Sequence, residues 1–146
     1  MKLKKVQNPK YDEIEVEIKY AVQDEDVNRL FSMLDAFDTQ IRCIDDMGEH
    51  LVNASDILYI ESVDRKTYVY PEQGVLMTEQ RLYQLAEALK PSGFVQISKA
   101  CLLNINTLEC IKPLMNSRME ATLKNGEKVH INRKYLSSIK NALKGV

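Results

Sequence analysis

The chain has 146 residues, of which 45% are hydrophobic and 28% are charged, and its formal net charge at pH 7 is −1. This length suits one domain, or one domain with an extension, and the hydrophobic content is sufficient for a buried core. No apolar run approaches the roughly 20 residues of a membrane-spanning helix, and no apolar stretch follows the basic N-terminus as it would in a signal peptide. We therefore expect a cytoplasmic protein.

The charge is distributed unevenly along the chain. Residues 1–10 carry four lysines, residues 11–62 hold 14 acidic and 3 basic residues, and residues 63–146 hold 7 acidic and 13 basic residues. This division predicts an acidic face and a basic face. A basic C-terminal part suits a nucleic-acid partner, although such asymmetry is also common in proteins that bind no nucleic acid.

The residues that most often carry chemistry are few and scattered. Cys43, Cys101 and Cys110 show no CxxC spacing, and His50 and His130 lie far apart in the sequence. We expect buried, reduced thiols and no zinc site. The glycines fall at turns or caps, and no nucleophile stands beside a base, so we expect neither an enzyme nor a bound cofactor or metal.

The first 44 residues are predicted to form a β–α–β extension. Residues 1–10 read as a loose basic arm, and residues 13–20 alternate apolar and charged side chains as a half-buried strand does. Asp24 begins a helix, and residues 39–44 form a second strand. The apolar stripe of that helix contains Val27, Leu30, Phe31 and Leu34.

This extension is too short to be a phosphorylated receiver domain, which needs roughly 120 residues. Asp45 and Asp46 form an acidic pair, but they precede Gly48 in a predicted turn. We therefore expect no control by aspartyl phosphorylation within these residues. We place a domain boundary between residues 1–44 and residues 45–146, and we expect the latter fragment to fold alone.

Residues 45–146 are predicted to be mostly antiparallel β-structure with short helices. A helix is expected after Thr78, Asn125-Gly126 predicts a type I′ hairpin turn, and a closing helix is expected over 133–144 with Gly145 at its end. The strands are expected at residues 57–62, 67–70, 75–77, 94–97, 109–114, 119–123 and 128–131.

The start of the closing helix carries an unusual charge. Asn132 is a good N-cap, yet the next two residues are the cations Arg133 and Lys134. Cations at a helix N-terminus oppose the helix dipole and cost a few tenths of a kcal/mol each. Positive charge beside free backbone amides suits an anion such as phosphate.

Several segments in this order resemble the LytTR DNA-binding domain of bacterial transcription regulators. The resemblance covers about residues 45 to 144, and the chain departs from the family pattern at Ala100, Asn132 and Lys134. The segments that carry it are Leu58–Ser62 with Lys66–Tyr70, Phe94–Lys99 with Leu102–Asn104, and Leu123–Gly126 with Asn132–Leu136.

The resemblance implies an α+β, mostly β fold: an elongated antiparallel domain with short flanking helices. It also implies three loops that enter successive grooves of double-stranded DNA. Lys99 and Lys134 fall on base-contacting positions, and the first loop's contact falls on Lys66 or Thr67. The candidate DNA-binding residues are Arg65, Lys66 and Thr67 in the first loop, Gln96, Ser98 and Lys99 in the second, and Asn132, Arg133 and Lys134 in the third.

By the same resemblance, we expect a sequence-specific transcriptional regulator. Repeated DNA elements, a homodimer on DNA and a small restraining membrane protein are the implied partners. The alternative is a protein-interaction module or antagonist with the same fold that does not bind DNA. The acidic segment 11–62 favours this alternative if it lies near the contact edge, because it would repel phosphate.

Overall fold

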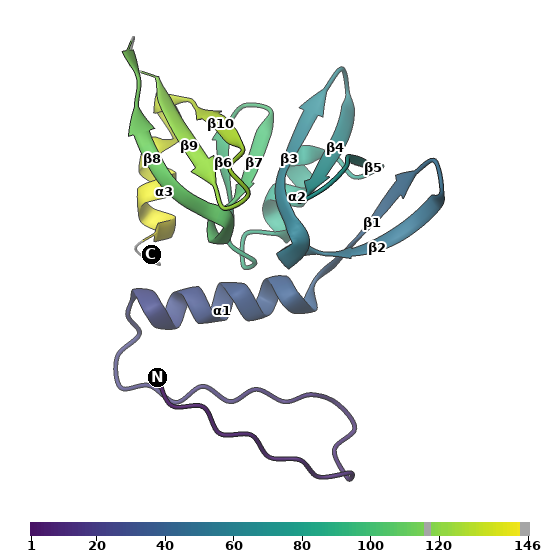
Figure 1. The fold of residues 1–146 in the computed structure, drawn as a ribbon, viewed down its shortest axis with the longest axis vertical. Helices are drawn as coiled ribbons and strands as arrows, with labels where there is room; N and C mark the ends of the chain where they lie inside the picture. Colours follow the sequence, from purple (N-terminus) through teal and green to yellow (C-terminus); the bar gives the residue numbers. More distant parts are fainter. Residues whose placement is uncertain (116–117, 144–146) are drawn as a thin grey trace.

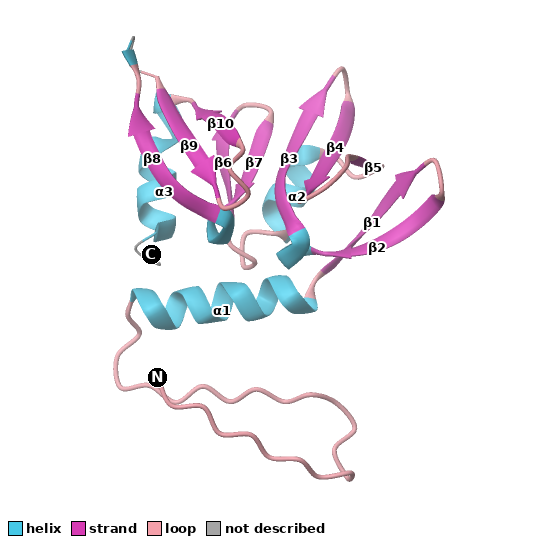
Figure 2. Ribbon diagram, viewed as in Figure 1, coloured by secondary structure: helices cyan, strands magenta, loops and turns pink. Residues whose placement is uncertain are grey.

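The computed structural model describes residues 1–115 and 118–143, and Figures 1 and 2 show two β-sheets with helices around them. In chain order the elements are α1 (Glu25–Asp38), β1 (Gln40–Asp45), β2 (Gly48–Asn53), the 3₁₀ turn η1 (Ala54–Asp56), β3 (Ile57–Val63), β4 (Lys66–Pro71), β5 (Leu76–Thr78), α2 (Leu82–Ala88), β6 (Phe94–Ser98), β7 (Cys101–Asn104), η2 (Ile105–Thr107), β8 (Leu108–Pro113), β9 (Met119–Leu123), β10 (Lys128–Ile131), η4 (Arg133–Tyr135) and α3 (Leu136–Leu143). This confirms the predicted α+β, mostly β fold class.

The larger sheet has seven antiparallel strands in the order β2-β1-β5-β4-β3-β7-β6. Strand β3 is covered on both faces, so its first four residues, Ile57 to Ile60, are all buried. Strand β4 alternates instead, with Thr67 and Val69 buried and Lys66 exposed. The smaller sheet has the order β10-β9-β8.

Two hydrophobic cores hold these layers together. The first core lies between the larger sheet and α2 and includes Ile60, Leu85 and Phe94. The second core joins β3, β6 and β7 to the smaller sheet and α3, and it includes Leu103 and Ile139. The phenolic oxygen of Tyr59 donates a 2.7 Å hydrogen bond to Glu127, which links the two sheets. Burial of apolar surface in both cores fixes their relative position.

Helix α1 begins as the sequence predicts and lies along one end of the sheets (Figure 1). The amide of Val27 donates to the Asp24 side chain at 2.9 Å, so Asp24 is the N-cap. The hydroxyl of Ser92 donates to the Asp35 carboxylate at 2.6 Å, and the amide of Ala54 donates to the Thr39 carbonyl at 2.8 Å. These bonds fasten the helix to the connections between strands.

The predicted β–α–β extension is wrong in its first strand. Residues 13–20 form no strand, and Ile14 is 86% exposed. Alternation makes a segment suited to a strand, but the strand forms only where a partner supplies hydrogen bonds. The second predicted strand is β1, which pairs with β2 and β5 inside the larger sheet. A boundary between residues 44 and 45 therefore passes through β1.

Two turns also differ from expectation. At Asn125-Gly126 only Gly126 has a positive φ, of 89°, which fits a three-residue loop with a bulge rather than a type I′ turn. The two-residue turn with both φ angles positive is Asp64-Arg65, between β3 and β4. Thr78 ends β5 and does not cap α2, which begins only at Leu82.

The closing helix is confirmed in place but not in its first turn. Residues Arg133–Tyr135 form the 3₁₀ turn η4, and α3 follows from Leu136. Its predicted end at residues 144–145 lies outside the described residues. Within the described residues, no helix has the length and apolar character needed to cross a membrane.

Candidate nucleic-acid interface

Neighbouring strands bring the first two candidate loops together, because the strands end on the same side of the larger sheet. Strand β3 pairs antiparallel with β7, with Glu61 opposite Cys101. The amide of Ser62 donates to the carbonyl of Ala100 at 2.8 Å. The β3–β4 turn and the β6–β7 turn therefore lie side by side, on the side of the molecule opposite α1 (Figure 1).

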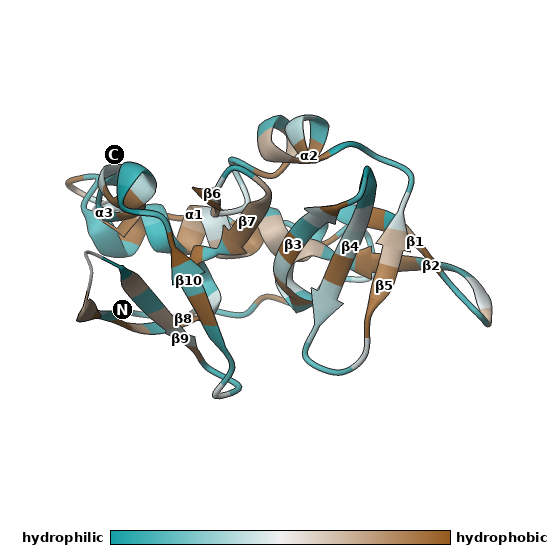
Figure 3. Ribbon diagram, turned by 90° about the horizontal axis from the view of Figure 1, so that it is seen from above, coloured by the Kyte–Doolittle hydropathy of each residue, from teal (hydrophilic) through white to brown (hydrophobic). Residues whose placement is uncertain are grey.

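A second backbone hydrogen bond adds the third loop. The amide of Asn132 donates to the carbonyl of Ile97 at 2.8 Å, which places the start of η4 beside the end of β6. We call the three segments together the loop edge: residues 64–66, 98–100 and 132–134. Figure 3 looks onto this end of the molecule and shows hydrophilic turns in front of more hydrophobic strands.

The first loop holds an unfavourable backbone conformation. Asp64 and Arg65 have φ angles of 50° and 66°, in the left-handed region that side chains usually avoid. The guanidinium of Arg81 donates to the Arg65 carbonyl at 3.1 Å and so supports the turn. Such strain is often found at functional sites.

Arg81 was missed by the sequence reasoning, although a signal was present. It stands immediately before α2, whose first residue is Leu82. A cation before a helix start is the same feature that singled out Arg133 and Lys134. The pairing of β5 with β4, which the sequence does not reveal, is what brings this segment beside the first loop.

The second loop is supported by two of its own candidates. The side-chain amide of Gln96 donates to the backbone carbonyl of Lys99 at 3.2 Å. The hydroxyl of Ser98 accepts from the backbone amide of Ala100 at 3.4 Å. Gln96 and Ser98 therefore shape the turn. Lys99 is exposed at its tip.

The third loop is fixed in the same way. The Asn132 side chain accepts from the Lys134 amide at 3.0 Å, as the predicted cap should. Arg133 and Lys134 are exposed beyond it, while Ile139 is fully buried where α3 packs against β6. Both cations consequently project from a backbone that is anchored to the core.

Thr67 does not fit the predicted role. Its side chain is only 3% exposed, on the same face of β4 as Val69, so it offers no surface to a DNA base or phosphate. Between the two predicted residues, exposure favours Lys66. The exposed cations of the loop edge are Arg65, Lys66, Lys99, Arg133 and Lys134.

These cations have no acidic partner in the described part of the chain. Within residues 1–115 and 118–143, the salt bridges join His50 to Asp45 and Lys128 to Glu120, and neither includes a cation of the loop edge. The nearby Glu61 is partly buried and accepts a 3.4 Å hydrogen bond from Tyr70. The five cations outnumber Asp64, the one acidic residue of the loop edge, so a net positive charge is available to an external anion.

The three cysteines are two buried thiols and one exposed thiol. Burial raises the pKa of Cys43 to about 11 and that of Cys101 to about 12, so both are neutral thiols at pH 7. Cys110 is exposed, so the prediction of burial is wrong for this residue. Across the described residues, no cluster of three or more His, Cys, Asp or Glu side chains could hold a metal ion.

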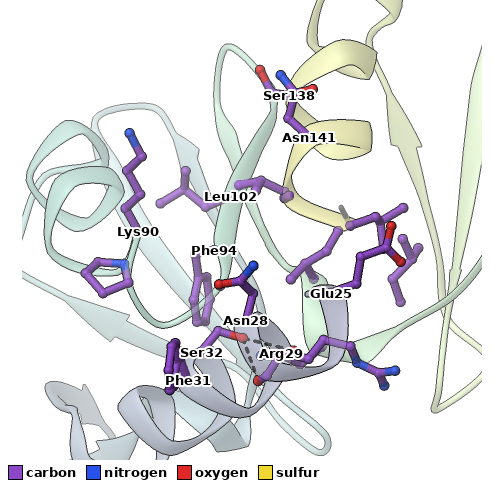
Figure 4. A pocket seen from close by; sticks show the side chains of 18 of the residues that line it. Glu25, Asn28, Arg29, Phe31, Ser32, Lys90, Phe94, Leu102, Ser138 and Asn141 are labelled. Atoms are coloured by element: carbon purple, nitrogen blue, oxygen red, sulfur yellow. Dashed lines mark hydrogen bonds between the residues drawn. The ribbon is translucent and has the colours of Figure 1, made fainter. Parts of the chain in front are cut away.

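A groove of about 1020 Å³ lies away from the loop edge, between α1, β6 and α3 (Figure 4). Phe31, Phe94 and Leu102 supply apolar surface, while Arg29 and Lys90 add charge. The Ser32 hydroxyl already donates to the Arg29 carbonyl at 3.0 Å. This mixture suggests packing between elements and not a reaction centre, so the loop edge is the better candidate site.

Comparisons with known proteins match this fold to one domain family. The family model of the LytTr DNA-binding domain matches residues 48–144. A solved LytTr DNA-binding domain from Bacillus cereus superposes with a TM-score of 0.66 at 25% identity, covering 72% of this chain and 96% of that one.

Curated relatives fall into two kinds. The sensory transduction protein LytT of Bacillus anthracis is 32% identical over 94 residues, which are 64% of this chain and 38% of LytT. An uncharacterized HTH-type transcriptional regulator of Staphylococcus aureus (strain MSSA476) is 25% identical over 145 residues, or 98% of both chains. The chain thus spans less than half the length of the LytT proteins it matches. It belongs to the LytTR DNA-binding domain family.

Proposed function

We propose that this chain is a sequence-specific, double-stranded DNA-binding regulator of transcription that contacts DNA through the loop edge. One observation carries the proposal: two backbone hydrogen bonds, Ser62 to Ala100 and Asn132 to Ile97, align three loops whose cations are exposed. Cationic side chains held in fixed positions can contact phosphates and read guanine edges in the major groove.

The loops are expected to contribute in different ways. Lys99 stands alone at the tip of a tight turn, which suits entry into a groove and contact with a base. Arg133 is exposed at the start of η4, where its guanidinium can contact a phosphate. Lys134 follows Arg133 on the same turn and is proposed to do both.

The rival function, a module that does not bind DNA, depended on acidic residues lying near the contact edge. Glu61 of the acidic segment 11–62 lies near the loop edge, but it is partly buried and accepts a hydrogen bond from Tyr70. Helix α1, with Glu25 and Asp26 in its first turn, lies at the end of the molecule opposite the loop edge (Figure 1). This observation favours the DNA-binding function.

Three further parts of the proposal rest on family likeness. Repeated DNA elements would place two protomers side by side, giving a homodimer on DNA. A small membrane protein would restrain the regulator in the cytoplasm. Residues 1–44 would serve regulation without phosphorylation, since their described structure is one helix, most of β1 and an extended segment, which is not a receiver domain.

Footprinting followed by a salt titration tests the function. The purified chain is expected to protect a defined site in its own promoter, and log Kd for that site should change linearly with log salt concentration. With the four loop-edge cations other than Lys99 neutralising phosphates, the slope would be about 3 to 4. Equal, weak binding to the promoter and to random DNA would contradict sequence-specific recognition.

A further inference from the structure

The N-terminal arm, residues 1–22, precedes α1 and forms neither helix nor strand. It contains a single turn, in which the Tyr11 amide donates to the Asn8 carbonyl at 3.1 Å and the Lys10 amide to the Asn8 side chain at 3.0 Å. This turn divides the arm into two extended halves, which lie on the far side of α1 from the sheets (Figure 1).

The arm exposes apolar side chains on a strand-like pattern. Ile14 and Val16 alternate with glutamates and are 86% and 61% exposed, and Leu3 on the other half is also exposed. The ring of Tyr20 packs edge-on against Phe31 at 5.8 Å and ties the end of the arm to α1. Exposed apolar groups and unpaired backbone on an extended segment are features of surfaces that pair with another chain.

The charges of the two halves are complementary. The basic half carries Lys2, Lys4 and Lys5, and the acidic half carries Glu13, Glu15 and Glu17. The turn between Asn8 and Tyr11 would set Lys4 opposite Glu15 if the halves paired as strands. Within residues 1–22, however, no strand pairing joins the two halves.

We propose that the N-terminal arms of two copies of this chain pair with each other, with the basic half of each arm facing the acidic half of the other. A two-fold interface brings the same surface of both copies together, so that surface must complement itself, and an arm with one half of each sign does so. An anionic membrane or a nucleic acid would attract the basic half and repel the acidic half.

Helix α1 offers an apolar surface that such a pair would cover. Met33 and Phe37 lie four residues apart, and therefore on one side of α1, and Phe37 is 62% exposed. Because the arm and α1 lie opposite the loop edge, pairing would leave both loop edges free (Figure 1). The inference does not rest on DNA binding, because the dimer would form without DNA.

Sedimentation velocity of the full chain without DNA tests the proposal directly. The unchanged protein should sediment as a dimer at micromolar concentration. The double variant Ile14→Asp, Val16→Asp should raise the dimer Kd at least about tenfold, because charge would enter the apolar contact. Val75→Asp is the matched control, since Val75 is 52% exposed outside the arm, and should remain dimeric.

Monomeric unchanged protein at all concentrations would overturn the proposal, and so would a double variant that dimerises like the control. A second substitution pair on α1, Met33→Asp with Phe37→Asp, should also weaken the dimer. Circular dichroism melting of each variant must match the unchanged protein, and a variant that melts early is replaced by the charge variants described next.

A charge exchange distinguishes pairing between copies from folding of one arm on itself. One variant carries Lys2→Glu, Lys4→Glu and Lys5→Glu, and the other carries Glu13→Lys, Glu15→Lys and Glu17→Lys. Each alone should be monomeric, because its two halves have the same sign. Their equimolar mixture should recover a dimer.

A mixture that stays monomeric, or a single charge variant that remains dimeric, would overturn pairing between opposite halves. A membrane partner is tested with phosphatidylglycerol vesicles. The unchanged protein should not cosediment with them, and cosedimentation of a monomer would assign the arm to the lipid surface instead.

Discussion

The loop edge and the N-terminal arm are both exposed and charged, but only one of them has a fixed backbone. The turns of the loop edge are joined to one another by the bonds from Ser62 to Ala100 and from Asn132 to Ile97, with buried residues behind them. The arm has one internal turn and one aromatic contact with α1. Charges on fixed turns can match the geometry of a ligand in advance, whereas the arm must obtain its geometry from a partner.

The largest effect expected from this comparison is on folding. At protein concentrations below the dimer Kd, deleting residues 1–22 should leave the melting temperature nearly unchanged, because the arm buries little surface within one chain. Deleting residues 1–44 should destabilise the protein by several kcal/mol, because it removes the buried residues Ala36, Ile41 and Cys43 and leaves β2 without its neighbour.

Thermal melting of the two truncated chains by circular dichroism checks this expectation. The same two truncated chains test the predicted domain division after residue 44. A 45–146 fragment that melts like the full chain would support that division and would show that α1 and β1 add little to the core.

Arg65 should show opposite effects on stability and on DNA affinity. Arg65→Gly relieves a positive φ of 66° and should raise the free energy of unfolding by about 0.5–1 kcal/mol. It also removes a cation from the loop edge, so affinity for promoter DNA should fall about tenfold, within the 1–3 kcal/mol of a good contact.

Chemical denaturation and fluorescence anisotropy measure the two effects. Arg42→Gly is the control, because Arg42 is an exposed arginine within β1, and should lower stability by about 0.5–1 kcal/mol without changing DNA affinity. A stable Arg65→Gly variant with full DNA affinity would remove Arg65 from the interface.

Arg81 should act through the position of the first loop. Arg81→Ala loses the hydrogen bond to the Arg65 carbonyl, which is worth about 0.5–1.5 kcal/mol. We expect a loss of promoter affinity of about threefold to tenfold, with a small change in melting temperature. Arg81→Lys should recover part of the affinity if charge contributes, and equal affinity in all three proteins would exclude Arg81 from this role.

The thiols give the smallest effect and report on the rigidity of the edge. Cys101 begins β7, immediately after the second loop, and its burial raises its pKa to about 12. At pH 8 an alkylating reagent should modify the exposed Cys110 rapidly and leave Cys43 and Cys101 protected until the chain unfolds. Fast alkylation of Cys101 in the native state would show that the loop edge opens.

The same burial predicts the direction of a pH effect. The pKa of Cys43 is raised from its ordinary value of 9.0 to about 11 in the folded state. Below pH 9 the thiol is protonated in both states, and its favourable contribution is fully present. As pH rises from 9 to about 11 only the unfolded chain loses the proton, so stability should decline, and Cys43→Ala should reduce that decline.

The sequence predicts most elements here because local signals and packing agree. The helix start at Asp24, the Asn132 cap and the segments of β3, β6 and β9 appear in the structure close to their expected places. The insertion of β5 between β1 and β4 could not be predicted, because strand order depends on pairing between distant segments. Residues 13–20 have the strand pattern but no partner within the chain.

Parts of the candidate site were open to prediction. The alternation along β4 puts Thr67 on the face of the buried Val69, so the pattern alone could have excluded Thr67. The supporting roles of Gln96 and Ser98 depend on the shape of the β6–β7 turn, which the sequence does not specify. The position of Arg81 beside the first loop could be known only from the pairing of β5 with β4.

The most direct test of the DNA-binding edge compares single alanine variants on promoter and scrambled duplexes at two salt concentrations. Lys99→Ala should weaken promoter binding by about 1–3 kcal/mol and leave scrambled DNA nearly unaffected, while Arg133→Ala should weaken both and lower the salt slope by about one. Lys134→Ala should show both effects, and Lys90→Ala, an exposed lysine beside the groove, should show neither. Unchanged promoter affinity in the three loop-edge variants, with melting intact, would contradict DNA binding through this edge.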